Sequence, residues 1–343
     1  MKKLLNTLYV TSPDTYLSLD GENIVVLKGE AEAARLPLHN LEGIVAFGYT
    51  GASPALMGAC VKRNIALTFM TQSGRFLARA VGEVNGNVTL RKEQYRISDD
   101  EEQSARLAAR FILGKLFNTR WVLERATRDY PTRLDAEKLK GVSQALAASI
   151  RLAADCSDLK QLRGIEGEAA SLYFSVFDDL ILQQKEGFTF QGRNRRPPLD
   201  NVNALLSFVY TLLAHDCAAA LEGVGLDAYV GFLHRDRPGR ISLALDLMEE
   251  LRSVYADRFV LSLINRREIT PSGFTRKENG AVIMDDDTRK AVLRAWQERK
   301  QEQITHPYLE EKTEWGLIPH VQAMLLARFI RGDLDDYPPF LWK

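Results

Sequence analysis

Apolar and polar positions alternate in short runs over about the first 95 residues, which is the pattern of β-strands. The apolar runs lie at residues 17–19, 24–27, 43–47 and 65–69, with turn residues such as Asp20-Gly21 between them. Short strands at this spacing predict a small β-sandwich. Residues 1–10 (MKKLLNTLYV) are predicted as the first strand, because Asn6 and Thr7 interrupt an apolar run that is too short for an export signal.

One helix is predicted inside this β region, at about residues 53–64. Ser53 can cap its amino end, and Pro54 then occupies the first helical position, where its missing N–H costs nothing.

After Ile97 the apolar period changes from that of strands to that of helices. Ser98 and Glu101 have the spacing of a capping box, and the acidic run from Asp99 to Glu102 suits the positive end of a helix dipole. Helices are predicted at 101–129, 134–156, 158–185, 200–222, 242–257, 286–303 and 316–331, with a loop or hairpin at 268–285. The chain is therefore predicted as α+β: an N-terminal β-sandwich domain at 1–95, joined near 84–100 to a larger all-α domain at 96–343.

Composition narrows the class of protein. The 343 residues are 45% hydrophobic and 26% charged, which excludes a disordered or collagen-like chain and predicts two domains. The 45 basic and 45 acidic residues cancel, so any contact with nucleic acid must come from local basic patches. Three scattered Cys and no C-x-x-C argue against disulfides or a cysteine zinc site and favour a reducing cytoplasm. The longest apolar stretch, 204–214, is about half of what a bilayer needs, so we expect a core helix and no membrane span.

The common nucleotide-binding and hydrolase motifs are absent, including GxxxxGK[ST], G-x-S-x-G and H-E-x-x-H. Three other segments contain the candidate chemistry. In the first, a helix would place Glu166 on one face with Ala169, Ala170 and Tyr173, so that a carboxylate points inward among small residues. Gly164 and Gly167 flank it and would let a backbone or ligand come close. The alternative is a buried Glu–Arg ion pair, for which Arg163 is the candidate partner.

The second segment joins a histidine to an acidic helix. His234 ends a short apolar run, and Ser242 opens a helix on which Asp246 and Glu249 are spaced i, i+3, so both carboxylates can approach one centre. Imidazole and carboxylates without thiolate suit Mg²⁺ or Mn²⁺. The alternative is a core histidine beside a solvated acidic flank.

Clusters of arginine accompany these acids. Rigid guanidinium groups bind phosphates bidentately, although a solvated loop or subunit contact would have the same pattern. The candidates are Arg193, Arg195 and Arg196 before two prolines, and Arg235, Arg237 and Arg240 beside His234. A further row on one helix gives candidate backbone-phosphate contacts: Arg106, Arg110, Lys115, Arg120, Arg125 and Arg128. Separated His and carboxylate ligands among arginines are typical of metal-assisted phosphodiester chemistry.

The segments GIEGEAASLYF, GRNRRPPLDNVNALLSFVYTLL and VGFLHRDRPGRISLALDLMEELR resemble those of the CRISPR-associated integrase family, the metal-dependent endonuclease of spacer acquisition. The resemblance runs nearly end to end, and LEGIVAFG, GNVTLRKEQY and the closing YPPFLWK are similar to the subtype I-C branch. It implies metal ligands at Glu166, His234 and Glu249, with Asp246 as a nearby fourth catalytic acid. Because Glu250 follows Glu249, the third ligand is open between them, and the aligned position favours Glu249.

The resemblance also implies partners. It predicts a homodimer formed through the β-sandwich domain, with two dimers around a dimer of the small second adaptation protein, acting on double-stranded DNA. The assembly would insert short duplexes into the repeat array, with an iron–sulfur exonuclease trimming the incoming DNA. The alternatives are a non-catalytic DNA-binding scaffold of the same fold and a metal hydrolase of a small phosphorylated substrate.

Overall fold

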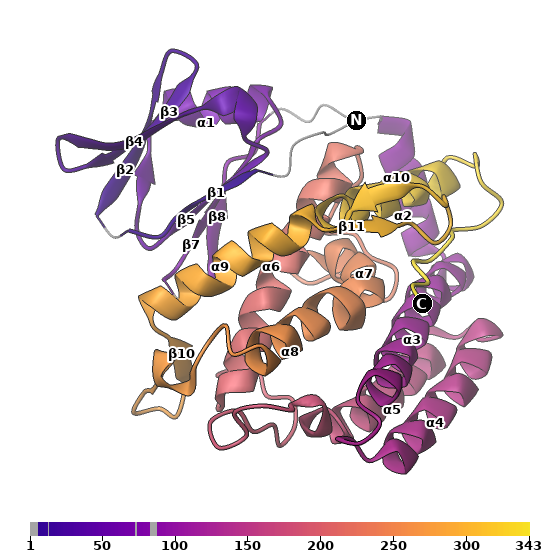
Figure 1. The fold of residues 1–343 in the computed structure, drawn as a ribbon. Coiled ribbons are helices and arrows are strands. Elements are labelled where there is room, and N and C mark those ends of the chain that lie inside the picture. The colour runs from indigo at the N-terminus through magenta and orange to yellow at the C-terminus, as the bar shows by residue number, and fades with distance from the viewer. Residues whose placement is uncertain (1–5, 13, 73, 83–87) are drawn as a thin grey trace. The chain divides into compact units, whose positions relative to one another are not determined.

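The computed structural model describes residues 6–12, 14–72, 74–82 and 88–343 and contains two compact units (Figure 1). One consists of residues 1–85 with 284–302, and the other of residues 86–283 with 303–343. Residues 1–5, the start of the predicted first strand, and 83–87, in the predicted join, lie outside the described residues.

Two four-stranded sheets form the first unit. The first sheet has the order β1-β5-β7-β8, in which β5 is parallel to both of its neighbours, β1 and β7. The second sheet has the order β4-β3-β2-β6. The strands are β1 Thr7–Val10, β2 Thr15–Asp20, β3 Asn23–Lys28, β4 Ala31–Pro37, β5 Gly43–Phe47, β6 Gly51–Ala52, β7 Ala66–Met70 and β8 Phe76–Arg79. The predicted strands are confirmed, whereas β4, β6 and β8 were missed because their residues are mostly exposed or too few to show an apolar run.

Both sheets and α1 (Pro54–Lys62) contribute to one core, as expected of a sandwich. Ile44 of β5, Leu17 of β2 and Leu56 of α1 are all fully buried in it. The predicted capping of α1 is confirmed, because the Ser53 hydroxyl accepts from the Leu56 N–H at 3.2 Å and Pro54 is the first helical residue. Helix α9 (Asp286–Gln301), predicted at 286–303, also belongs to this unit.

The second unit is built mainly from helices. Helices α3, α4 and α5 pack against one another; the carboxylate candidates lie on α5 and α7 (Figure 1), and His234 lies in the loop between α6 and α7. The helices are α2 Val88–Asp99, α3 Glu101–Asp129, α4 Ala136–Ala154, α5 Leu159–Ser175, α6 Asn201–Gly223, α7 Ser242–Leu251, α8 Arg258–Asn265 and α10 Ile318–Ile330. Helix α6 is apolar and long enough to cross a membrane, yet 72% of its most apolar window is buried in the unit, as a core helix requires.

The start of this unit differs from the sequence prediction. Helix α2 runs unbroken through residue 95, where the β region was expected to end, and the Gln94 amide donates to the Asp227 and Val230 carbonyls at 2.8 and 2.9 Å. The capping box is also wrong. Asp100, not Ser98, caps α3, because its carboxylate accepts from the Glu102 and Gln103 N–H groups at 3.0 Å each.

Two helix ends differ from the prediction, and two short hairpins occur among the helices. Helix α5 ends at Ser175, ten residues before the prediction, because the chain turns there to pack Phe174 and Phe177 against Phe190. Beyond α7 the helix continues through a π-helical turn, Arg252–Asp257, into α8. Two short hairpins also occur: β9 Phe274–Arg276 with β10 Val282–Met284, as predicted for 268–285, and β11 Gln303–Thr305 with β12 Lys312–Glu314.

Candidate active site

Two of the predicted ligands meet at a lysine. The Lys115 ammonium, from α3, forms ion pairs with Glu166 on α5 and, at 2.7 Å, with Oε2 of Glu249 on α7. The side chains of Lys115 and Glu249 are 9% and 6% exposed, whereas Glu166 is 28% exposed. The structure thus brings Glu166 and Glu249 together around a buried positive charge, with Glu166 nearest to solvent.

A second cation fixes Glu249 from the other side. Nη1 of Arg252 donates to the two carboxylate oxygens of Glu249 at 2.9 and 3.2 Å, and the guanidinium lies over the Tyr210 ring with 4.4 Å to its centroid. Burial by itself would raise the pKa of Glu249, but Lys115, Arg252 and His234 together hold this pKa well below its usual range. Glu249 is therefore a charged carboxylate at neutral pH.

His234 is oriented by Asp246. Oδ1 of Asp246 lies 2.6 Å from Nδ1 of His234, and the same carboxylate accepts from the backbone N–H groups of Phe232, Leu233 and His234 at 2.7–3.0 Å. Asp246 is fully buried, and these hydrogen bonds satisfy its carboxylate oxygens in place of water. The His234 side chain is 22% exposed. This pairing leaves Nε2 of His234 as the nitrogen for a ligand. Asp246, predicted as a nearby fourth acid, is thus the hydrogen-bond partner that orients His234.

Arg163 braces the same loop. Its Nε and Nη2 donate to the Leu233 carbonyl at 3.0 and 2.6 Å. The buried Glu166–Arg163 pair, considered as an alternative from sequence, is therefore wrong: Glu166 pairs with Lys115. Gly164 and Gly167 are exposed, and a Cβ at either would meet nothing within 4 Å, so the open side of α5 flanks Glu166.

Glu250, the competing third ligand, is bound by a different set of groups. Its carboxylate is completely buried and accepts from the Tyr337 hydroxyl, from the Phe340 N–H at 2.7 Å and from the Gln322 amide at 3.2 Å. Burial raises the pKa of Glu250 to about 7, against these hydrogen bonds, which lower it. Both carboxylate oxygens of Glu250 are bound by these groups, so neither is available to share a metal ion with Glu166.

The donor set suits a hard divalent cation. Two carboxylates and one imidazole nitrogen are ligands that Mg²⁺ and Mn²⁺ accept. No three His, Cys, Asp or Glu side chains among the described residues already converge as a metal site, and the Lys115 ammonium lies between Glu166 and Glu249. Glu166 and Glu249 already bind one cation between them, the Lys115 ammonium, and this observation supports the fit of a divalent metal ion to the same two carboxylates.

The sequence missed the position of Lys115, which was grouped with the phosphate contacts on the outside of its helix. Its neighbours one turn away, Phe111, Ile112, Asn118 and Thr119, are all buried. That helical phase is the signal that places Lys115 on the inner face. Arg110 and Arg120 of the same row form ion pairs on the surface, with Asp336 at 2.6 Å and with Glu124 at 3.4 Å.

The arginines of the two basic loops differ in how far their side chains are buried. Arg193 is a structural brace and not a free phosphate contact, because it donates to Asn203 at 2.7 Å and to Ser207 at 3.0 Å, and burial lowers its pKa to about 10. Exposed side chains belong to Arg195, Arg196, Arg235 and Arg237, and Arg240 is half-buried.

Arg240 is close enough to charges of both loops for them to affect its pKa. Burial lowers the pKa of Arg240, the neighbouring Arg237, Arg163 and Arg196 lower it further, and Asp246 opposes them. Positive charge from segments about 40 residues apart in sequence is thus gathered beside the acidic cluster.

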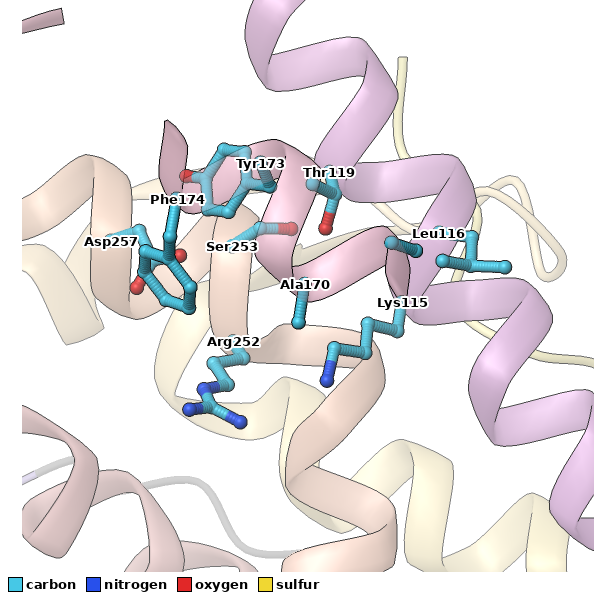
Figure 2. Close-up of a pocket in the computed structure, with 10 residues that line it drawn as sticks. Lys115, Leu116, Thr119, Ala170, Tyr173, Phe174, Arg252, Ser253 and Asp257 are labelled. Carbon is cyan, nitrogen blue, oxygen red and sulfur yellow. The ribbon is translucent and has the colours of Figure 1, made fainter. Parts of the chain in front are cut away.

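A small cavity of about 20 Å³ lies behind this site, lined by Lys115, Tyr173, Arg252 and Asp257 among others. Figure 2 shows Lys115 and Arg252 extending into the same region from two different helices. A cavity of this size has room for about one water molecule. The carboxylates are therefore reached from the outer side, where Glu166 and His234 are 28% and 22% exposed.

A family model described as CRISPR associated protein Cas1 matches residues 8–298. The chain belongs to the Cas1 family. The CRISPR-associated endonuclease Cas1 1 of Chlorobaculum tepidum is 54% identical over 343 residues, all of both chains. A CRISPR-associated exonuclease Cas4/endonuclease Cas1 fusion of Geobacter sulfurreducens is 36% identical, covering 98% of this chain and 60% of the fusion.

Solved structures share the fold of this Cas1 chain. A casposase bound to integration product has a TM-score of 0.84 at 22% identity, covering 98% of this chain and 94% of the casposase. A Cas6-RT-Cas1–Cas2 complex has a TM-score of 0.81 at 20% identity, covering 98% of this chain and 36% of that one. At these identities the likeness establishes the α+β fold alone.

Proposed function

We propose that the chain is the metal-dependent integrase of CRISPR adaptation, which inserts short duplex DNA into the repeat array. The observation that carries the proposal is the meeting of Glu166 and Glu249 around a cation in a Cas1 family member, with His234 contributing to the charge on Glu249. Membership of subtype I-C is part of the proposal, and the closing sequence segments support it.

Glu166, Glu249 and Nε2 of His234 would hold Mg²⁺ or Mn²⁺, which when bound supplies a Lewis acid for the phosphodiester under attack. The remaining residues prepare these ligands. Asp246 keeps the His234 proton on Nδ1, and Arg252 keeps Glu249 in place and charged.

The reaction is a transesterification. The 3′-hydroxyl of the incoming strand forms a new bond to a repeat phosphorus, and the bond from that phosphorus to the target 3′-oxygen breaks. The proton lost by the attacking hydroxyl balances the proton gained by the leaving oxygen. Because water in place of the hydroxyl gives hydrolysis, endonuclease activity at the same site is expected.

DNA phosphates are proposed to lie against the outer arginines, Arg195, Arg196, Arg235, Arg237 and Arg240. Their exposed or half-buried side chains, and the closeness of Arg240 to charges of both loops, support this assignment. Removing one phosphate contact should weaken binding about equally for all sequences and reduce its salt dependence.

The proposed partners are double-stranded DNA, a second copy through the β-sandwich unit, and the small second adaptation protein, in an assembly of two integrase dimers around one partner dimer. The likeness to a chain of a Cas1–Cas2 complex supports the adaptation partner, and the fused exonuclease of the Geobacter relative supports an iron–sulfur exonuclease. The proposed location is the cytoplasm.

Strand transfer tests the proposal. The wild type, Glu166→Ala and His234→Ala are incubated with a labelled duplex and a supercoiled repeat plasmid in Mn²⁺, Mg²⁺ or EDTA, with and without the small partner. Metal-dependent joining by the wild type and its loss in both variants are expected. A wild type that binds the DNA but neither joins nor cuts it in any metal would instead indicate a non-catalytic scaffold.

A further inference from the structure

We propose that Lys115 is a built-in competitor for the metal: its ammonium occupies the place between Glu166 and Glu249 and must withdraw before a divalent cation can bind there. The inference rests on the proposed metal site and goes beyond it, because it assigns a role to a residue that is not a ligand. Lys115 is nine-tenths buried and forms ion pairs with both carboxylates, one from each of two helices.

Space is the first argument. Mg²⁺ holds its oxygen ligands at about 2.0–2.1 Å. The ammonium nitrogen is 2.7 Å from Oε2 of Glu249 and pairs with Oε1 of Glu166. An ion shared by these same two oxygens would overlap this nitrogen, so the two cations exclude each other.

Charge is the second argument. Two carboxylates face two cations, since Arg252 also binds Glu249 and is only 10% exposed. The cluster is therefore already neutral. A divalent ion that entered while Lys115 stayed would add uncompensated positive charge to a nearly buried site, which is costly. Withdrawal of Lys115 removes part of that excess.

Close packing between two helices fixes the backbone at Lys115. Gly114 precedes it, and a Cβ at Gly114 would lie 2.7 Å from the Glu250 Cβ, so α3 and α7 pack closely at this point. The lysine stem is consequently directed at Glu249 and not at solvent. Of the four carbons that link the ammonium to the helix, the outer ones can still rotate about single bonds, and this allows the charge to leave while the helices stay in place.

Mn²⁺ binding measures the competition. The dissociation constant is determined by titration calorimetry and by Mn²⁺ EPR for the wild type, Lys115→Met and Lys115→Gln. Without the ammonium, Mn²⁺ should bind about tenfold more tightly or better, the scale of one charged hydrogen-bonded pair. The control is Lys138→Met, which removes a half-exposed lysine paired with Asp179 at 2.6 Å. Its dissociation constant should equal that of the wild type.

The outcomes separate the inference from the function. Unchanged or weaker Mn²⁺ binding in both Lys115 variants would overturn the competition, because the lysine would then only align the ligands. No saturable binding by any protein would overturn the metal site and the competition together. Normal metal binding without strand transfer would refute the integrase and leave the competition standing.

Crystals of the wild type soaked in Mn²⁺ give a readout that needs no variant to fold. Anomalous density between Glu166 and Glu249, with the Lys115 nitrogen beyond hydrogen-bond distance of both, is the expected result. Density for the ion with both lysine contacts intact would refute the proposal.

Discussion

Replacing Asp246 by Asn tests how His234 is prepared for its role. The carboxylate accepts four hydrogen bonds: Oδ2 from the Phe232 and Leu233 N–H groups at 2.7 and 3.0 Å, and Oδ1 from the His234 N–H at 3.0 Å with Nδ1 at 2.6 Å. An amide has one oxygen and an NH₂ group that accepts nothing. One side of this arrangement must therefore be lost.

The better orientation keeps the amide oxygen on Phe232 and Leu233 and turns the NH₂ toward His234. One buried backbone N–H then lacks an acceptor, which costs about 1–3 kcal/mol of folding free energy. More importantly, Nδ1 must accept from the amide, so the ring proton moves to Nε2 and blocks the nitrogen meant for the metal. Loss of such an orienting carboxylate typically weakens metal binding by about 10–100-fold.

Mn²⁺ dissociation constants and urea unfolding curves are compared for the wild type, Asp246→Asn and Asp236→Asn, the last being an exposed carboxylate two residues after His234. Asp246→Asn should lose both metal affinity and stability, and strand transfer should fall with them, while Asp236→Asn should change none of the three. An Asp246→Asn protein that loses stability but binds Mn²⁺ within about twofold of the wild type would refute the tautomer argument.

Three further changes have signs fixed by the structure. Burial raises the pKa of Glu250 from an ordinary 4.5 to about 7, so the folded protein keeps a proton that the unfolded chain releases, and stability falls as pH rises from about 4.5 to about 7, by up to about 3 kcal/mol. Glu250→Gln should remove that slope in urea unfolding followed from pH 5 to 8, and an unchanged slope would contradict the shift. Gly114→Ala should destabilise the helical unit by about 1–3 kcal/mol, because the added Cβ meets the Glu250 Cβ at 2.7 Å, and an unfolding midpoint equal to that of the wild type would exclude this close packing. Gly167→Leu should keep or raise the melting temperature, since nothing lies within 4 Å, yet reduce strand transfer by blocking the open side of Glu166; full activity would place the DNA elsewhere.

Local signals predicted much of the fold. Helix α3 begins and ends at the predicted residues 101 and 129, and Ser53 caps α1 as predicted, because periodicity and capping act over a few neighbouring residues. Strand β4 was missed for the opposite reason. Most of its residues are exposed, so they show no apolar pattern, and the strand is held in place by its hydrogen-bonded pairing with β3. The pairing of Lys115 with Glu166 joins positions 51 residues apart, which no local pattern encodes.

Adjacent Glu249 and Glu250 show why the choice of ligand could not come from spacing alone. They differ by one step on α7, yet Lys115 and Arg252 hold the first charged, whereas burial against the C-terminal segment raises the pKa of the second to about 7. The groups that decide, Gln322, Tyr337 and Phe340, lie 72 to 90 residues away in the chain. Glu250 therefore has less negative charge near neutral pH than Glu249, which Lys115 and Arg252 hold fully charged. Tyr337 and Phe340, near the end of the sequence, therefore help to decide which of the two adjacent carboxylates is available as a ligand.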